Sequence, residues 1–111
     1  MDSILTTIKQ MLGGAAEDTH FEPDIIRHIN TAFSTLHQIG VGPAEGFMIY
    51  DEMSIWGDFI SGASFMKMQM IITYVYDTVK LRFDPPTTTA HIEALKRDIA
   101  ELEWRLSVAV D

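Results

Sequence analysis

The chain has 111 residues, of which 47% are hydrophobic and 22% charged, a composition typical of one folded domain. Sixteen acidic residues against eight basic ones give a formal net charge of −8, which argues against a protein that grips the nucleic-acid backbone through clustered lysine and arginine. The absence of cysteine excludes disulfides, thiolate metal sites and cysteine nucleophiles. No apolar run approaches the ~20 residues of a membrane span, so we expect no membrane association, and residues 1–10 lack the basic and apolar parts of a secretory signal.

Amphipathic periodicity predicts the first two helices. The first starts after Asp2 or Ser3, either of which can cap it, and ends at Gly13-Gly14. The second opens around Pro23 and stops before Gly40. Its apolar residues share one face, which we expect to lie in the core: Ile25, Ile29, Ala32, Phe33 and Leu36.

Residues 40–62 predict a long, structured loop. Phe47 to Tyr50 is compatible with one short strand, and Ser54 with the cap of a short helix that carries Trp56 and Phe59. Trp56 either anchors the loop to the helices or contacts a partner, and the anchoring role is favoured because aromatic burial readily orders a loop.

Two long helices follow, separated by Asp84-Pro85-Pro86, since proline stops a helix and disfavours helical angles in the residue before it. Thr87, Thr88 and Thr89 are candidate caps for the last helix, and the two helices should pack antiparallel as an α-hairpin. The sequence therefore predicts an all-α fold: a single domain over residues 1–111, built as a small bundle of about four helices with a long loop between the second and third.

Both long helices carry a second apolar face. Asp77 interrupts that of the third helix, and each helix has a regular core stripe on its other side. A second face needs a second partner, so we predict a protein-protein interface formed by Met66, Met70, Tyr74, Leu81, Trp104 and Val108. The alternative is that both helices are central in a compact bundle, which would bury both faces within one chain.

The sequence contains no recognisable catalytic motif. It has no G-x-S-x-G elbow, no H-E-x-x-H and no glycine-rich phosphate loop. His28 and His37 are nine residues apart, which is not the spacing of a chelating pair on a helix. We therefore expect a protein that is not an enzyme and has no catalytic, cofactor-binding or metal site.

Several segments together resemble the head-tail connector, adaptor or head-completion proteins of tailed bacteriophages and prophages. The likeness covers nearly the whole chain, with the segments in the same order. The residues that carry it are Phe21-Glu22-Pro23-Asp24-Ile25-Ile26, Gly40-Val41-Gly42-Pro43, Trp56-x-x-Phe59, Val79-x-x-Arg82-Phe83-Asp84-Pro85-Pro86 and Glu101-Leu102-Glu103-Trp104-Arg105-Leu106.

The resemblance implies a structural subunit of a homo-oligomeric ring, typically dodecameric, that docks on the portal protein. Such a ring binds a tail-side connector or tail-completion protein and surrounds the passing DNA without sequence-specific binding. It also implies synthesis in the bacterial host cytoplasm, a final place in the virion at the head-tail interface, and a role in assembly for Trp104, Val108 and the end of the chain, residues 107–111.

A second hypothesis stays open at this point. The chain is also compatible with a small cytoplasmic helical adaptor or regulatory module that forms a homodimer. A dimer needs one self-complementary surface, whereas a ring needs two different surfaces that fit each other.

Overall fold

The computed structural model describes residues 2–16 and 19–108, and in this part of the chain the fold is all-α, as predicted. Four long helices and one short helix are present, together with two short 3₁₀ turns. Their bounds are α1 (Ile4–Leu12), η1 (Gly13–Ala16), η2 (Thr19–Phe21), α2 (Glu22–Gln38), α3 (Trp56–Phe59), α4 (Phe65–Phe83) and α5 (Thr89–Ser107).

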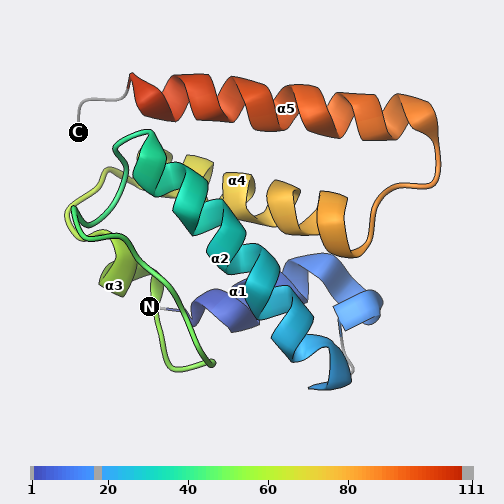
Figure 1. The fold of residues 1–111 in the computed structure, drawn as a ribbon, viewed down its shortest axis with the longest axis horizontal. Helices are drawn as coiled ribbons and strands as arrows, with labels where there is room; N and C mark the ends of the chain where they lie inside the picture. Colours follow the sequence, from blue (N-terminus) through green and yellow to red (C-terminus); the bar gives the residue numbers. More distant parts are fainter. Residues whose placement is uncertain (1, 17–18, 109–111) are drawn as a thin grey trace.

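Helix α4 is the centre of the bundle. In Figure 1, α2 crosses α4 and α1 lies below it, while α5 runs antiparallel to α4 and forms the opposite edge of the molecule. The second apolar face of α4 is therefore covered by α5 of the same chain at Tyr74, whereas Met66, at the start of the helix, stays exposed. The alternative of a central helix thus holds for the middle of α4, while the start of α4 and the outer face of α5 keep exposed apolar side chains.

Side-chain caps and glycine set the helix ends. Ser3, one of the two predicted caps, accepts a hydrogen bond from the amide of Thr6 (3.2 Å). Gly13 ends α1 with a φ of 74°, a conformation that glycine adopts without strain. Of the three threonines before α5, Thr88 is the cap and accepts from the amide of His91 (3.2 Å).

The loop between α2 and α3 is ordered by a side chain rather than by a strand. The prediction of a strand over Phe47 to Tyr50 is wrong: within the described residues the single β-bridge joins Ser3 and Ile55. Asn30 of α2 instead holds the loop, because its amide donates to the carbonyl of Ile49 (2.9 Å) and its oxygen accepts from the Ile49 amide (2.8 Å).

The predicted cap of the short helix is also corrected. Ile55, not Ser54, occupies the cap position of α3, and the carboxylate of Asp58 accepts its amide hydrogen (3.0 Å). The carbonyl of Ser54 is used elsewhere, since it accepts a hydrogen bond from the amide of Ile4 (3.0 Å). Through this hydrogen bond the loop holds the first residue of α1 in place.

An aromatic cluster joins the loop to the helices. Phe33 of α2 contacts the rings of Phe47, Trp56 and Phe59, and all but Phe47 are at most 2% exposed. The indole Nε1 of Trp56 donates to the Thr7 hydroxyl (3.1 Å). Trp56 is therefore an anchor of the loop, as favoured from the sequence.

No helix in the described part of the chain combines the length and the apolar character needed to span a bilayer.

Candidate functional site

The hairpin of α4 and α5 brings together two of the six predicted interface residues, Met66 and Met70. Met66 and Met70 line a shallow groove between the two helices, and Tyr74 lies one turn further along α4. We call this the α4/α5 groove; it has a volume of about 370 Å³ and is lined by Phe65, Met66, Gln69, Met70, Thr73, Leu102 and Arg105. Apart from Arg105 it carries no charged side chain.

Tyr74 is not part of this surface. It is 2% exposed, and its hydroxyl donates a hydrogen bond to the Glu103 carboxylate on α5 (2.8 Å). Burial and this carboxylate raise the pKa of the Tyr74 hydroxyl. Tyr74 therefore joins α4 to α5 within one chain, and its predicted place on an outer face is corrected.

Trp104 and Val108 project from the outer face of α5, away from α4. They are 67% and 57% exposed, and neither lines the α4/α5 groove. Leu81 is half-buried near the other end of α4. The six residues thus divide among the groove, the outer face of α5 and the interior. Residues 109–111 lie outside the described part.

The sequence analysis missed one exposed apolar surface. In the loop after α2, Met48, Tyr50 and Met53 are exposed, Tyr50 and Met53 by more than three quarters; we call these three residues the loop tip. Ile49 between them is fully buried, so Met48 and Tyr50 point outward, as alternate residues of an extended segment do. The alternation was visible in the sequence, but its buried residue was not identifiable without the Asn30 contact. Phe65, the first residue of α4, is also exposed.

Two carboxyl groups face each other between α4 and α5. Asp77 of α4 is 5% exposed, and its Oδ2 has no hydrogen-bond partner among the described residues. Burial, together with the neighbouring Asp98 of α5, raises the pKa of Asp77 to about 8. With a pKa in this range Asp77 is largely uncharged at neutral pH, which reduces the repulsion between its carboxyl group and that of Asp98.

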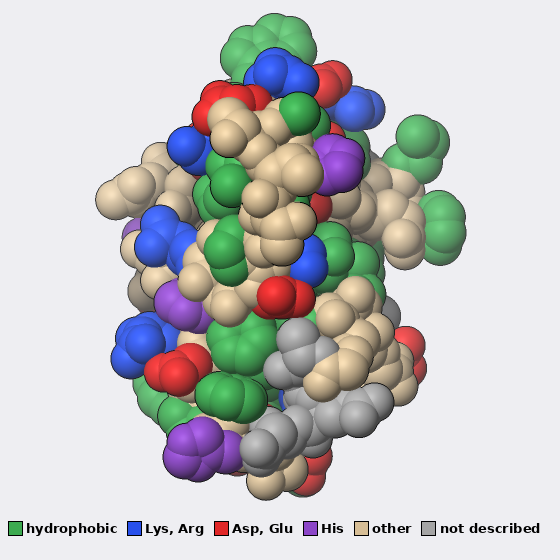
Figure 2. Space-filling model, turned by 90° about the vertical axis from the view of Figure 1, so that its right-hand side faces the viewer, with side chains coloured by type: hydrophobic (Ala, Val, Ile, Leu, Met, Phe, Trp, Pro, Cys, Tyr) green, Lys and Arg blue, Asp and Glu red, His purple; other side chains and the backbone are tan. Residues whose placement is uncertain are grey.

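Charge is mixed over the surface. Figure 2 looks onto the end of the molecule where α4 passes into α5, and there lysine and arginine side chains alternate with acidic and apolar ones. An apolar side chain projects at the upper edge, over α5. This face has no continuous basic area of the kind that binds nucleic-acid backbone.

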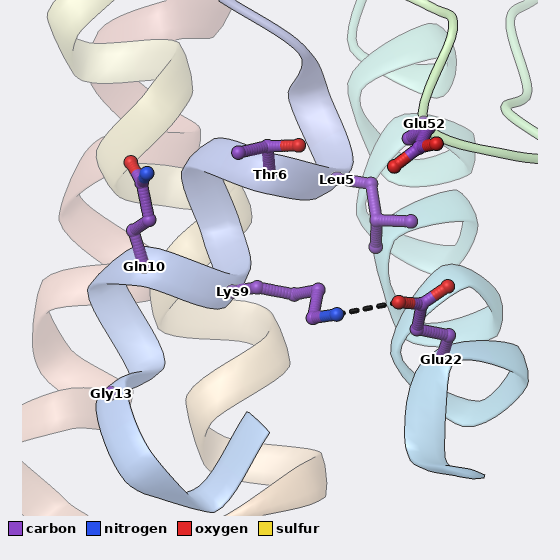
Figure 3. Close-up of a pocket in the computed structure, with 7 residues that line it drawn as sticks. All are labelled: Leu5, Thr6, Lys9, Gln10, Gly13, Glu22 and Glu52. Atoms are coloured by element: carbon purple, nitrogen blue, oxygen red, sulfur yellow. Dashed lines mark hydrogen bonds and ion pairs between the residues drawn. The ribbon is translucent and has the colours of Figure 1, made fainter. Parts of the chain in front are cut away.

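A second hollow lies between α1 and α2, next to the loop. Figure 3 shows Lys9 of α1 reaching to Glu22 at the start of α2, with which it forms an ion pair, and Glu52 of the loop above them. The hollow has a volume of about 380 Å³. Its one basic group is thus already paired, and its lining holds neither histidine nor serine: Leu5, Thr6, Lys9, Gln10, Gly13, Glu22 and Glu52.

The described residues contain no group of three histidine or carboxylate side chains placed to hold a metal ion. His28 is half-buried, and burial and the nearby Arg27 lower its pKa, so it is neutral at pH 7. His37 lies on the other side of α2, against the loop, near Gly46.

Comparison with known proteins agrees with this description. A family model described as "Phage connector protein" matches residues 4–111, which is nearly the whole chain. No curated protein and no solved structure was found to match.

Proposed function

Since the chain belongs to the phage connector protein family, we propose that it is a non-catalytic subunit of a ring that docks on the portal protein and joins head to tail. The family is a structural one, and its members are components of the virion. The match over residues 4–111 is the observation that carries the proposal, and the surfaces described above support it.

Self-assembly into a ring needs two different surfaces on each subunit. The protein has candidates for both, because the α4/α5 groove and the outer face of α5 lie at one edge and the loop tip at another. A homodimeric adaptor would need only one surface that is complementary to itself. The separate apolar areas therefore favour the ring, which we propose to be dodecameric in the virion.

The net charge supports a channel through which DNA passes. With −8 for each subunit, a dodecamer carries roughly −100, and a surface of this sign repels the phosphate backbone. DNA would then move through the ring without adhering to it or being read.

The outer face of α5 is the proposed contact with the portal or the tail-side connector. Trp104 is the largest exposed side chain on it, and large aromatic residues dominate the binding energy of protein interfaces. A partner that covers Trp104 would therefore gain much of its affinity there.

The mass of the purified protein, measured by light scattering over a concentration series with and without the portal protein of the same phage, tests the proposal. We expect an assembly near twelve subunits, either alone or on the portal. Trp104→Asp should weaken association, whereas the matched control Trp104→Phe should retain it. A dimer whose mass does not change with concentration, or a monomer that does not bind the portal, would contradict the proposal.

A further inference from the structure

Two apolar surfaces without a partner lie at opposite edges of the molecule. Tyr50 and Glu52 border hollows formed with α1 and the start of α2, so the loop tip belongs to the lower edge in Figure 1. The α4/α5 groove belongs to the upper edge, where α5 lies. Single exposed apolar residues are common on protein surfaces, but three of them within one short, fixed loop segment are not.

The loop tip is held in place before any contact is made. Asn30 makes two hydrogen bonds to the backbone of Ile49, and the Asp51 carboxylate accepts from the amide of Met53 (2.8 Å). These bonds fix the loop on both sides of Tyr50. Little conformational entropy is then lost on binding, which favours affinity.

The α4/α5 groove fits such a tip in its chemistry. Its floor and walls are mainly apolar, with Phe65 and Met66 exposed by 78% and 70%. Methionine adapts its shape readily to an inserted side chain. The groove therefore offers an apolar lining that can close around methionine and tyrosine.

Charge complementarity points to a second copy of this chain as the occupant. Arg105 is the one charged residue of the groove, and Glu52 lies in the sequence between Tyr50 and Met53 of the loop tip. Both side chains are exposed, and among the described residues neither takes part in an ion pair. A groove facing another groove would instead bring two Arg105 side chains together, which like-charge repulsion disfavours.

We propose that the loop tip of one subunit inserts into the α4/α5 groove of the next, with Glu52 beside the neighbour's Arg105. This contact is head-to-tail, so each subunit uses its tip on one side and its groove on the other. The inference rests on the proposed ring function and identifies the two surfaces that would build the ring.

Cysteine cross-linking tests the contact directly, because the natural chain contains no cysteine. The double variant Met53→Cys/Met66→Cys should form a ladder of disulfide-linked oligomers under oxidised glutathione, both in concentrated solution and on the portal. A ladder of linked chains distinguishes this contact from a bond within one chain, which would leave the monomer mass unchanged. The control Met53→Cys/Met11→Cys, which uses an exposed methionine on α1, should give at least about fivefold less product.

Mixing the single variants tests the direction of the contact. Met53→Cys mixed with Met66→Cys should give dimers and nothing larger, because each molecule then carries half of the linkage. If Met66→Cys alone cross-links as well as the mixture, the groove is its own partner and the proposal is wrong.

A charge exchange tests the pairing of Glu52 with Arg105. Glu52→Arg or Arg105→Glu alone should weaken self-association about tenfold, and the double variant should restore it. If the protein forms oligomers or rings on the portal while the cross-link and the rescue both fail, this inference is overturned and the connector function remains. If neither self-association nor portal binding occurs, both proposals fail.

Discussion

Replacement of Asp77 by asparagine should stabilise the protein increasingly as the pH rises. Asp77 has a pKa of about 8 in the folded protein against 3.8 in the unfolded chain, owing first to burial and then to Asp98. The stability that depends on protonated Asp77 is therefore fully present below pH 3.8, and it is lost as the pH rises towards 8. Over that interval the unfolded chain releases a proton that the folded protein retains.

This difference in proton binding sets the size of the pH effect on the free energy of unfolding. The free energy of unfolding of the wild type falls by up to about 1.4 kcal/mol per pH unit from this group. Between pH 5 and pH 7 the loss is on the order of 2–3 kcal/mol, and asparagine, which has a similar shape and no charge, does not incur it. For a domain of this size that corresponds to a gain of roughly 10 °C in Tm relative to the wild type.

Thermal unfolding followed by circular dichroism at pH 5, 6, 7 and 8 measures the effect. The Tm difference between Asp77→Asn and the wild type should widen across the series. Asp98→Asn should flatten the pH dependence in part, since it removes the neighbouring carboxylate. Glu101→Gln, at an exposed position of the same helix, serves as the control and should follow the wild type. Parallel curves for Asp77→Asn and the wild type would refute the raised pKa of Asp77.

Three further changes test the contacts that hold the loop and α5. Asn30→Ala removes both hydrogen bonds to Ile49 and should lower the free energy of unfolding, measured with denaturant, by about 1–3 kcal/mol. Hydrogen exchange in the loop should also become faster. An unchanged exchange rate would contradict the role of Asn30 in holding the loop. Trp56→Phe loses the bond to Thr7 but keeps most of the ring, so about 1 kcal/mol is expected, and a Thr7→Val change in the same background should add little. Thr88→Ala removes the cap of α5 and should lower stability by about 1 kcal/mol in the same assay, whereas Thr88→Ser should restore it.

The helices were predictable from the sequence because their ends depend on local chemistry. The ends of α1 follow from Ser3 and Gly13, and the turn between α4 and α5 follows from Asp84-Pro85-Pro86. Caps and prolines act within a few residues, so short-range patterns are sufficient to place them.

Which partner covers an apolar face was not predictable in the same way. Tyr74 and Met70 lie on the second apolar side of α4, yet Tyr74 is covered by α5 while Met70 borders an open groove. Periodicity gives the direction of a side chain but not what lies opposite it. The same limit explains the loop, where the buried Ile49 depends on Asn30, 19 residues away.

Helix α5 packs mainly on α4. Its resistance to local unfolding therefore differs from that of the rest of the molecule. Only Leu102 and Leu106 of α5 are buried, while α2 buries five side chains and α4 six. Elements with few buried contacts open more often than the rest of a protein and without global unfolding. The amides of α5 should thus exchange with solvent through a local opening that leaves α1, α2 and the loop intact. Such an opening would move α5 alone, while the remainder of the fold keeps its buried contacts.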